Sequence, residues 1–289
     1  MGVVVKGVCS LDAFDRTESF DDYFSNEDVL EINGYKLKFL KGEFWTSKQR
    51  QGSSIHEISY RACFKSQLPL FFIQKLTNIN SVIFDPFMGR GTTVVEGVLN
   101  GRRSIGMDVN PLSEILTLPR INIPQIKNVF DRIDSIELQQ NLRAEIDLSM
   151  FYHPATESEL VSLKNYLSYR KEEEQEDNVD KWIRMVATNR LSGHSAGFFS
   201  VYTLPPNQAT TPEEQIRINE KRQQKPEYRD IKKLIKKNTL SLLKDFNEDS
   251  INKINSVGLK SELLVEDSRI SQRHRNHYLY HPKQHTHLN

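Results

Sequence analysis

The fold of this chain is indicated by the stretch Ser81-Val82-Ile83-Phe84-Asp85-Pro86-Phe87-Met88-Gly89-Arg90-Gly91-Thr92-Thr93. An apolar run ends in Asp-Pro-Phe, a Gly-x-Gly turn follows, and Thr-Thr opens an amphipathic helix that we expect over 92–99. A second short strand is expected over 103–107, and Asp108 ends it. A strand, a glycine turn, a helix and a strand with a terminal acid are typical of a nucleotide-like cofactor bound on a parallel sheet.

The residues at the strand ends suit ligand binding. Gly89 and Gly91 permit torsions that other residues avoid, and they let the main chain approach a ligand closely. The helix that follows points free N–H groups into the same space. Asp108 lies 23 positions after the acid that ends the first strand, close to the spacing of about 20 at which an acid binds ribose hydroxyls. A third strand over 262–267 would end at Asp267, which could accept a hydrogen bond from an adenine amino group.

Two other interpretations compete for the glycine turn. An isolated Gly-x-Gly after a strand is often only a turn, but here Asp-Pro-Phe precedes it and a strand-terminal acid follows at the right spacing. A nicotinamide site expects a third glycine three positions after Gly91, where Val94 stands. The combination of features favours a cofactor site of another kind.

These motifs resemble those of the N4-cytosine and N6-adenine DNA methyltransferases of restriction–modification systems. Asp85 to Thr93 is similar to the first cofactor motif of that family, Met107 to Pro111 to the second and Leu263 to Arg269 to the third. The segment 64–69 is similar to the part that closes the pocket over the methionine end. The resemblance implies S-adenosylmethionine as the cofactor. It implies these cofactor-binding residues: Asp85, Pro86, Phe87, Gly89, Gly91, Thr92, Asp108, Asn110 and Asp267.

The resemblance implies an α/β fold with an incomplete Rossmann-like S-adenosylmethionine-dependent methyltransferase core and a helical insertion. In a minimal doubly wound fold the third strand follows the second within a few tens of residues, but roughly 150 residues separate them here. We therefore expect an N-terminal extension, a cofactor-binding core in two pieces, a helical insertion that could contact DNA, and an irregular tail. Their ranges are 1–55, then 56–116 with 257–269, then 117–256, and then 270–289.

Several local elements are expected outside the core motif. Asn33-Gly34 predicts a β-hairpin over 28–40. An apolar face predicts a helix over 56–78. Helices in the insertion are expected at 126–145, 157–189 and 212–246. His194, Phe198, Phe199 and Tyr202 lie in an irregular segment, where packing of the aromatic rings is favoured over a base-binding loop.

The catalytic half of the family's active site has no counterpart in the sequence. The family uses Asp, Asn or Ser, then Pro-Pro, then an aromatic residue that stacks on the flipped base. Pro-Pro occurs once, at Pro205-Pro206, with Leu204 before it and Asn207 after it. Methylation at cytosine C5 is excluded because neither Cys9 nor Cys63 follows a proline. No catalytic residue is assigned, and the chain resembles a methyltransferase truncated before its catalytic motif.

The composition changes near Arg269. The tail 270–289 holds five of the eight histidines and little apolar periodicity. A shift of reading frame near Arg269 is the preferred hypothesis, an ordinary tail is the second, and a histidine-rich metal-binding tract is the third.

The composition describes a polar protein with a nearly neutral balance. The 289 residues carry a net charge of +1, so DNA contact would come from a local patch. The stretch 215–246 holds ten Lys and Arg against four Asp and Glu, which suits either phosphate contact or a solvated helix face. Two cysteines without metal-binding spacing predict no structural zinc, and no apolar run approaches the roughly 20 residues of a membrane span. A cytoplasmic location is expected.

Three hypotheses about activity follow. The chain is a truncated and inactive methyltransferase of double-stranded DNA, or half of a split enzyme whose second subunit carries the catalytic motif. The third possibility is a non-catalytic DNA-binding or regulatory protein that keeps the cofactor fold. A cognate restriction endonuclease is a further partner that the resemblance implies.

Overall fold

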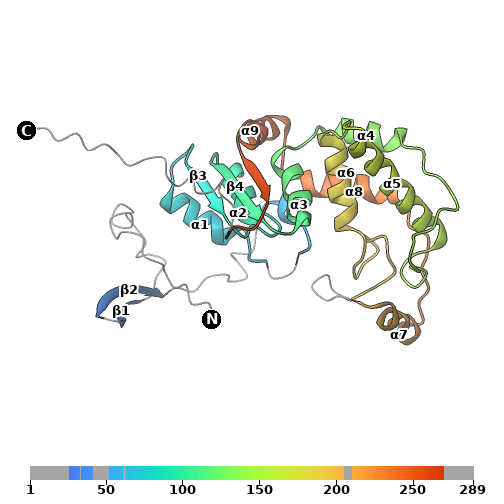
Figure 1. Cartoon of the computed structure of the whole chain (residues 1–289), viewed down its shortest axis with the longest axis horizontal. Helices are drawn as coiled ribbons and strands as arrows, with labels where there is room; N and C mark the ends of the chain where they lie inside the picture. The colour runs from blue at the N-terminus through green and yellow to red at the C-terminus, as the bar shows by residue number, and fades with distance from the viewer. Residues whose placement is uncertain (1–25, 33, 42–51, 61–62, 205–209, 270–289) are drawn as a thin grey trace, which may run out of the picture.

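The centre of the fold is a parallel sheet of three strands in the spatial order β3-β4-β5. β3 (Val82–Asp85) and β5 (Glu262–Val265) pair with opposite edges of β4 (Arg103–Asp108). The computed structural model describes residues 26–32, 34–41, 52–60, 63–204 and 210–269 (Figure 1). Ile105 and Met107 are buried on one face of β4 and Ser104 on the other, as expected for a central strand that is covered on both faces.

Four helices accompany the sheet. They are α1 (Gln67–Leu76), α2 (Thr92–Leu99), α3 (Pro111–Ile121) and α9 (Glu248–Gly258). α2 contacts β3 and β4, α3 contacts β5, and α9 contacts α2, α3 and β4. The glycine turn after β3 leads directly into α2, so the position of this helix fixes the turn.

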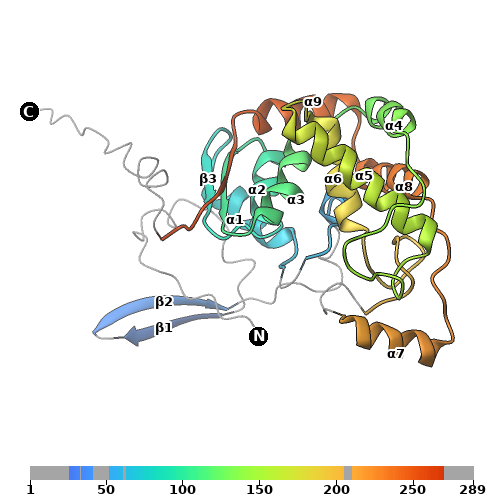
Figure 2. The same ribbon diagram turned by 45° about the vertical axis from the view of Figure 1, so that its right-hand side comes forward.

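The residues between α3 and α9 form a second, helical part of the molecule (Figure 2). It contains α4 (Ile126–Ser135), α5 (Pro154–Glu172), α6 (Asn178–Asn189), α7 (Pro212–Arg222) and α8 (Ile231–Leu243). Trp182 of α6 is fully buried, and its Nε1 donates a hydrogen bond of 3.1 Å to Thr239 Oγ1 of α8. Because α6 also contacts α3, the two parts share one apolar core.

The helical part begins and ends at one place. Asn255 of α9 accepts a hydrogen bond of 2.7 Å from the Ile123 N–H and donates one of 2.9 Å to the Ile123 carbonyl. Gly258 lies against the end of α3, where an added Cβ would lie 1.7 Å from the Ile121 carbonyl oxygen. The chain therefore leaves the core and returns to it at adjacent points.

The predicted α/β fold class is confirmed, and each predicted strand is present, but the third strand ends at Val265 and not at Asp267 as predicted. The hairpin consists of β1 (Asn26–Ile32) and β2 (Tyr35–Lys41), which pair antiparallel and stand apart from the other elements in Figures 1 and 2. The helix after the glycine turn has the predicted bounds, 92–99. Among the described residues, no helix is both long and apolar enough to cross a bilayer.

The prediction of one helix over 56–78 is wrong for its first half. Residues 54–56 form a single 3-10 turn, and α1 begins only at Gln67. The segment Ser53–Tyr60, which we call the strap, instead buries Ile55 and Ile58 and gives its carbonyl groups to side chains of other elements. Pro69 does not interrupt α1 because it lies in the first turn, where its missing N–H is not needed.

The predicted helix over 126–145 is wrong beyond Ser135. After α4 the backbone N–H groups of the next segment bond to side chains of α5: Gln139 to Ser162, and Leu142 to Ser158. The serine hydroxyl oxygens accept the hydrogen bonds that main-chain carbonyl groups would accept if α4 continued. The segment therefore lies along α5 without helical structure.

The other two long predicted helices are each divided. A turn at 173–177 separates α5 from α6, with Glu174 at a φ of 56° and Asp177 capping α6. Gln223, at a φ of 50°, ends α7 before Pro226, and α8 begins at Ile231. Short polar turns within a polar helical pattern carry little apolar signal, which is why the periodicity did not separate them.

Candidate functional site

The carboxyl ends of the three parallel strands meet at one edge of the sheet. Asp85 ends β3 and Asp108 ends β4, and the register pairs Asp85 with Gly106 and Asp108 with Val265. The Glu266 N–H donates to the Asp108 carbonyl (3.1 Å), so the chain after β5 continues alongside. Ligands of open α/β sheets bind outside these strand ends.

The glycine turn has the backbone shape that its sequence predicts. Gly89 has a φ of 52° and Gly91 a φ of 75°, both in the left-handed region that favours glycine. Gly91 is also constrained by packing, because an added Cβ would lie 2.2 Å from Thr117 Oγ1 of α3. A Cβ on Gly89 would meet only the Tyr60 ring, at 3.3 Å. Gly91 is therefore needed for the packing of α2 on α3, and Gly89 faces the strap.

Asp108 links the ends of two strands. Its Oδ2 accepts a hydrogen bond of 2.9 Å from the Gly89 N–H, and its Oδ1 accepts one of 2.9 Å from the Asn110 N–H. Each carboxylate oxygen has a second lone pair, and the side chain is only partly buried. The exposed apolar side chains of Phe87 and Val109 lie in the two loops that Asp108 joins. An oriented carboxylate beside exposed apolar groups suits a ligand with hydroxyl groups and a flat ring.

Three other predicted site residues have structural partners. Asp85 Oδ1 accepts from the Phe87 N–H (3.1 Å) and shapes the turn. Thr92 is buried, and its Oγ1 accepts from Arg90 Nε (3.1 Å). Asn110 Oδ1 accepts from the Leu112 N–H (3.0 Å) and caps α3. These contacts hold the loop in its observed conformation.

Asp267 is paired with a cation. Both oxygens of its carboxylate accept from the Arg269 guanidinium, with a shortest distance of 2.6 Å. The Arg269 side chain lowers the pKa of Asp267 to about 2. A ligand that used this carboxylate would have to share it with Arg269.

Four buried polar residues in and around the glycine turn were not predicted from the sequence: His56, Arg90, Glu96 and Arg120. His56 Nε2 lies 2.8 Å from Glu96 Oε1. Burial lowers the pKa of His56, and the Glu96 contact only partly opposes it. Full burial, with Arg90 beside it, lowers the pKa of Arg120 to about 9. The only sequence signal was an arginine between two glycines, a position where an exposed side chain is the ordinary expectation.

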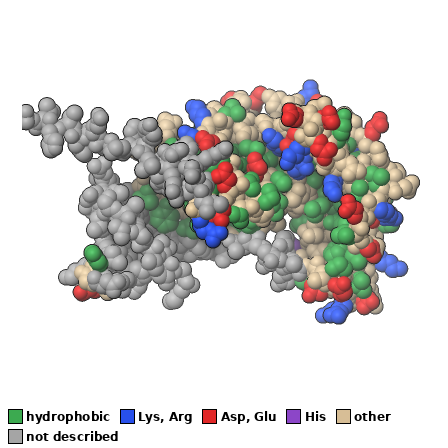
Figure 3. All heavy atoms as spheres, viewed as in Figure 1, with side chains coloured by type: hydrophobic (Ala, Val, Ile, Leu, Met, Phe, Trp, Pro, Cys, Tyr) green, Lys and Arg blue, Asp and Glu red, His purple; other side chains and the backbone are tan. Residues whose placement is uncertain are grey.

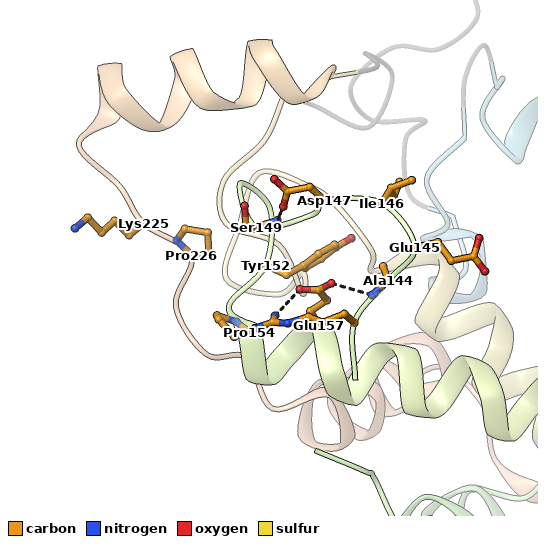
Figure 4. Close-up of a pocket in the computed structure, with 11 residues that line it drawn as sticks. Ala144, Glu145, Ile146, Asp147, Ser149, Tyr152, Pro154, Glu157, Lys225 and Pro226 are labelled. Atoms are coloured by element: carbon orange, nitrogen blue, oxygen red, sulfur yellow. Dashed lines mark hydrogen bonds and ion pairs between the residues drawn. The ribbon is translucent and has the colours of Figure 1, made fainter. Parts of the chain in front are cut away.

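A separate cavity of about 560 Å³ lies in the helical part, away from the glycine turn (Figure 4). It lies between segment 143–149, Tyr152 and the chain after α7 at Lys225. Glu157 on its floor is buried and accepts hydrogen bonds from Arg143 Nη1 (2.8 Å) and the Ala144 N–H (3.0 Å). The Glu157 carboxylate therefore already has hydrogen-bond partners within the protein.

Two lysines of the basic stretch 215–246 bond to other parts of the protein. Lys236 Nζ lies 2.6 Å from Asp134 Oδ1, and Lys232 Nζ donates to the Ile136 carbonyl (2.5 Å). Lys233 and Lys237 of α8 are exposed. Positive and negative side chains are intermixed over the helical part on the face shown in Figure 3.

The irregular segment 191–204 packs as expected from its aromatic residues. Phe198 and Phe199 are buried, and the Arg190 guanidinium lies 5.1 Å from the centre of the Phe198 ring. Pro205-Pro206 and the histidine-rich tail 270–289 lie outside the described residues. Among the described residues, no group of three His, Cys, Asp or Glu side chains could hold a metal ion.

The segment that contains the glycine turn is similar to known proteins. Residues 18–115 match the family described as DNA methylase. The Type II methyltransferase M.MjaII of Methanocaldococcus jannaschii is 31% identical over 100 residues, 33% of this chain and 19% of that protein. The Type II methyltransferase M.MvaI of Kocuria varians is 39% identical over 61 residues, 20% of this chain and 13% of that protein. The chain thus matches less than a fifth of the length of each relative. No solved structure matches it.

Proposed function

We propose, from the premise that this chain belongs to the DNA methylase family of N4- and N6-methyltransferases, that it forms the methyl-donor half of such an enzyme's active site. The donor is S-adenosylmethionine, and the acceptor is an exocyclic amine of cytosine or adenine in double-stranded DNA. The observation that carries the proposal is the Asp108 carboxylate, held by Gly89 at the ends of β3 and β4.

The donor site is formed by the loops after the three strands. Asp108 accepts hydrogen bonds from the ribose hydroxyls, for which its second lone pairs suffice. Phe87 and Val109 supply apolar surface for the adenine ring. Gly89 and Gly91 supply the left-handed torsions that bend the main chain beside the donor. The bound cofactor supplies an activated methyl group.

The remaining predicted site residues act in different ways. Asp85, Thr92 and Asn110 shape the loops through the contacts described above, and Pro86 holds the turn between Asp85 and Phe87. Asp267 reaches the adenine amino group only when its ion pair with Arg269 opens or is shared.

The acceptor side is proposed to come from a second subunit that carries the catalytic motif. The single Pro-Pro of the sequence lacks a polar residue before it and an aromatic residue after it. With residues 56–116 and 257–269 as the donor core, residues 117–256 are the part through which this chain contacts DNA. Exposed Lys233 and Lys237 favour that role because phosphate contact needs unpaired cations.

Two measurements test the proposal. Isothermal titration calorimetry of the full chain with S-adenosylmethionine should show one site; no heat of binding would reject the donor site. Transfer of a radiolabelled methyl group to plasmid DNA should be absent with the chain alone and should appear when the neighbouring gene product is added. Transfer by the chain alone would reject the need for a second subunit. Binding without transfer under either condition would favour a non-catalytic DNA-binding or regulatory protein. The proposed place of action is the cytoplasm.

A further inference from the structure

The strap Ser53–Tyr60 is fastened to the helical part at two points. The Ser54 N–H donates to Asp245 Oδ2 (2.7 Å), and Ser54 Oγ donates to the Leu242 carbonyl of α8 (2.9 Å). The Ser59 N–H donates to Oδ1 of Asn189, the last residue of α6, at 2.8 Å. Asn189 Nδ2 returns a hydrogen bond of 3.4 Å to the Glu57 carbonyl. The strap therefore follows the positions of α6 and α8.

The same strap is held by the glycine turn. Arg90, between the two glycines, points its guanidinium into the protein and not toward solvent, and its exposed fraction is 9%. Its Nη1 donates to the carbonyls of Ile58 (2.5 Å) and His56 (3.3 Å). Its Nη2 donates to the Phe64 carbonyl (3.4 Å). One side chain of the turn thus binds three carbonyl groups around the strap.

A second arginine fixes the turn from below. Arg120 of α3 is fully buried and donates to the carbonyls of Leu116 (2.7 Å), Ile55 (3.5 Å) and Arg90. These partners are carbonyl groups, so main-chain dipoles, and not a carboxylate, stabilise the buried charge. A buried cation is destabilised when it loses a hydrogen-bond partner. Displacement of the strap, which supplies the Ile55 carbonyl, should therefore affect Arg120 and the turn.

We propose that Arg90 is a positioning residue for the methyl donor, and that the strap transmits the position of the helical part to the glycine turn through Arg90. The positioning role of Arg90 rests on the proposed function, because it assumes that the turn binds S-adenosylmethionine. A shift of α6 or α8 moves the strap carbonyls, Arg90 follows them, and the torsions at Gly89 and Gly91 change. DNA contact by the helical part would then alter the donor site without touching it.

Hydrogen–deuterium exchange of the full chain tests the transmission without any ligand. Asn189→Ala removes the α6 anchor of the strap, whose hydrogen bonds go to Ser59 and Glu57 and not to segment 87–95. It should raise exchange in segment 87–95 by about threefold to thirtyfold. Asn238→Ala is the matched control, because Asn238 is a similarly buried asparagine of α8 that bonds only within its own helix.

The outcomes separate the two claims. Unchanged exchange at 87–95 in Asn189→Ala, or an equal rise in Asn238→Ala, would overturn the transmission. Arg90→Gln should weaken S-adenosylmethionine binding about tenfold in calorimetry, with Arg184→Gln in the helical part as the control. Unchanged affinity in Arg90→Gln would overturn the positioning role. If the unmodified chain does not bind the cofactor, the proposed function and the positioning role both fail, and the exchange result still decides the transmission.

Discussion

Asp108 and Gly89 are joined by a hydrogen bond of 2.9 Å between a strand-terminal carboxylate and the amide of the glycine turn, although they lie nineteen positions apart. This bond ties the loop after β3 to the end of β4, so it connects the two sides of the proposed donor site. A side chain that orients the loop and remains partly exposed can serve both the fold and a ligand.

Replacing Asp108 should weaken cofactor binding more than it weakens the fold. Asp108→Ala removes a charged acceptor, and hydrogen bonds to charged groups contribute about 1.5–3 kcal/mol each. We expect S-adenosylmethionine affinity in calorimetry to fall about tenfold to a hundredfold. Asp134→Ala, which removes an exposed aspartate paired with Lys236, is the control and should bind normally. Normal binding by Asp108→Ala would contradict the assignment.

Gly91 should tolerate alanine less well than Gly101 does. Both have a φ near +75°, which costs an alanine about 1–2 kcal/mol. At Gly101 the nearest atom to an added Cβ is 3.6 Å away, whereas at Gly91 it is Thr117 Oγ1 at 2.2 Å. Forcing Thr117 aside adds about 1–3 kcal/mol. Urea denaturation should therefore show a larger loss in the free energy of unfolding for Gly91→Ala than for Gly101→Ala. Equal losses would show that Thr117 and α3 move aside without a free-energy cost.

Asp180 should be much more sensitive to substitution than the exposed Asp134 of the same helical part. Its fully buried side chain accepts from Arg132 Nη1 (2.5 Å) and Arg170 Nε (2.8 Å). Removing one partner of a buried ion pair costs about 3–5 kcal/mol. Asp180→Asn should lower the free energy of unfolding by about that amount. Asp134→Asn, at an exposed pair, should cost at most about 1 kcal/mol. Similar losses in both variants would argue against the burial of Asp180.

Stability should decrease as the pH falls through the range just below 6.5, and His56 should be a cause. Burial holds the pKa of folded His56 below its ordinary value of 6.5, so the unfolded chain takes up a proton first. Between the ordinary and the lowered pKa, protonation therefore favours unfolding. Above 6.5 this contribution is constant.

Urea denaturation at several pH values above and below 6.5 measures this slope. The slope should become smaller in His56→Gln and should persist in His194→Gln, whose imidazole is exposed. An unchanged slope in His56→Gln would show that other groups cause the pH dependence.

The sequence predicted the parts of the fold whose signals are local. The strands at 82–85 and 103–108 and helix 92–99 follow from apolar runs beside glycine turns. Residues 56–60 of the strap were included in the helix predicted over 56–78 from the apolar face of Phe64, Leu68, Phe71, Phe72 and Leu76. The strap is instead held by Arg90, which lies more than thirty positions away. Local periodicity contains no information about such distant hydrogen bonds.

The residues of the candidate site also fall into those that local spacing predicted and those that depend on distant packing. The glycines and Asp108 were predicted from spacing, and the structure brings them together. The burial of Arg90 and Arg120 depends on where α3 and the strap pack, which spacing does not reveal. The ion pair of Asp267 with Arg269 involves residues two positions apart, and the sequence alone does not say whether such neighbours pair.

The two hydrogen bonds between Asn255 and Ile123 hold the start of the helical part against α9. The helical part is nevertheless more than an insertion tied at this point, because α6 packs on α3 and the strap is bonded to both α6 and α8. A helical part that also supports the core cannot be replaced by an arbitrary module. A recognition module grafted from another protein would have to present surfaces equivalent to those of α6 and α8, so that α3 stays covered and the strap keeps its anchors.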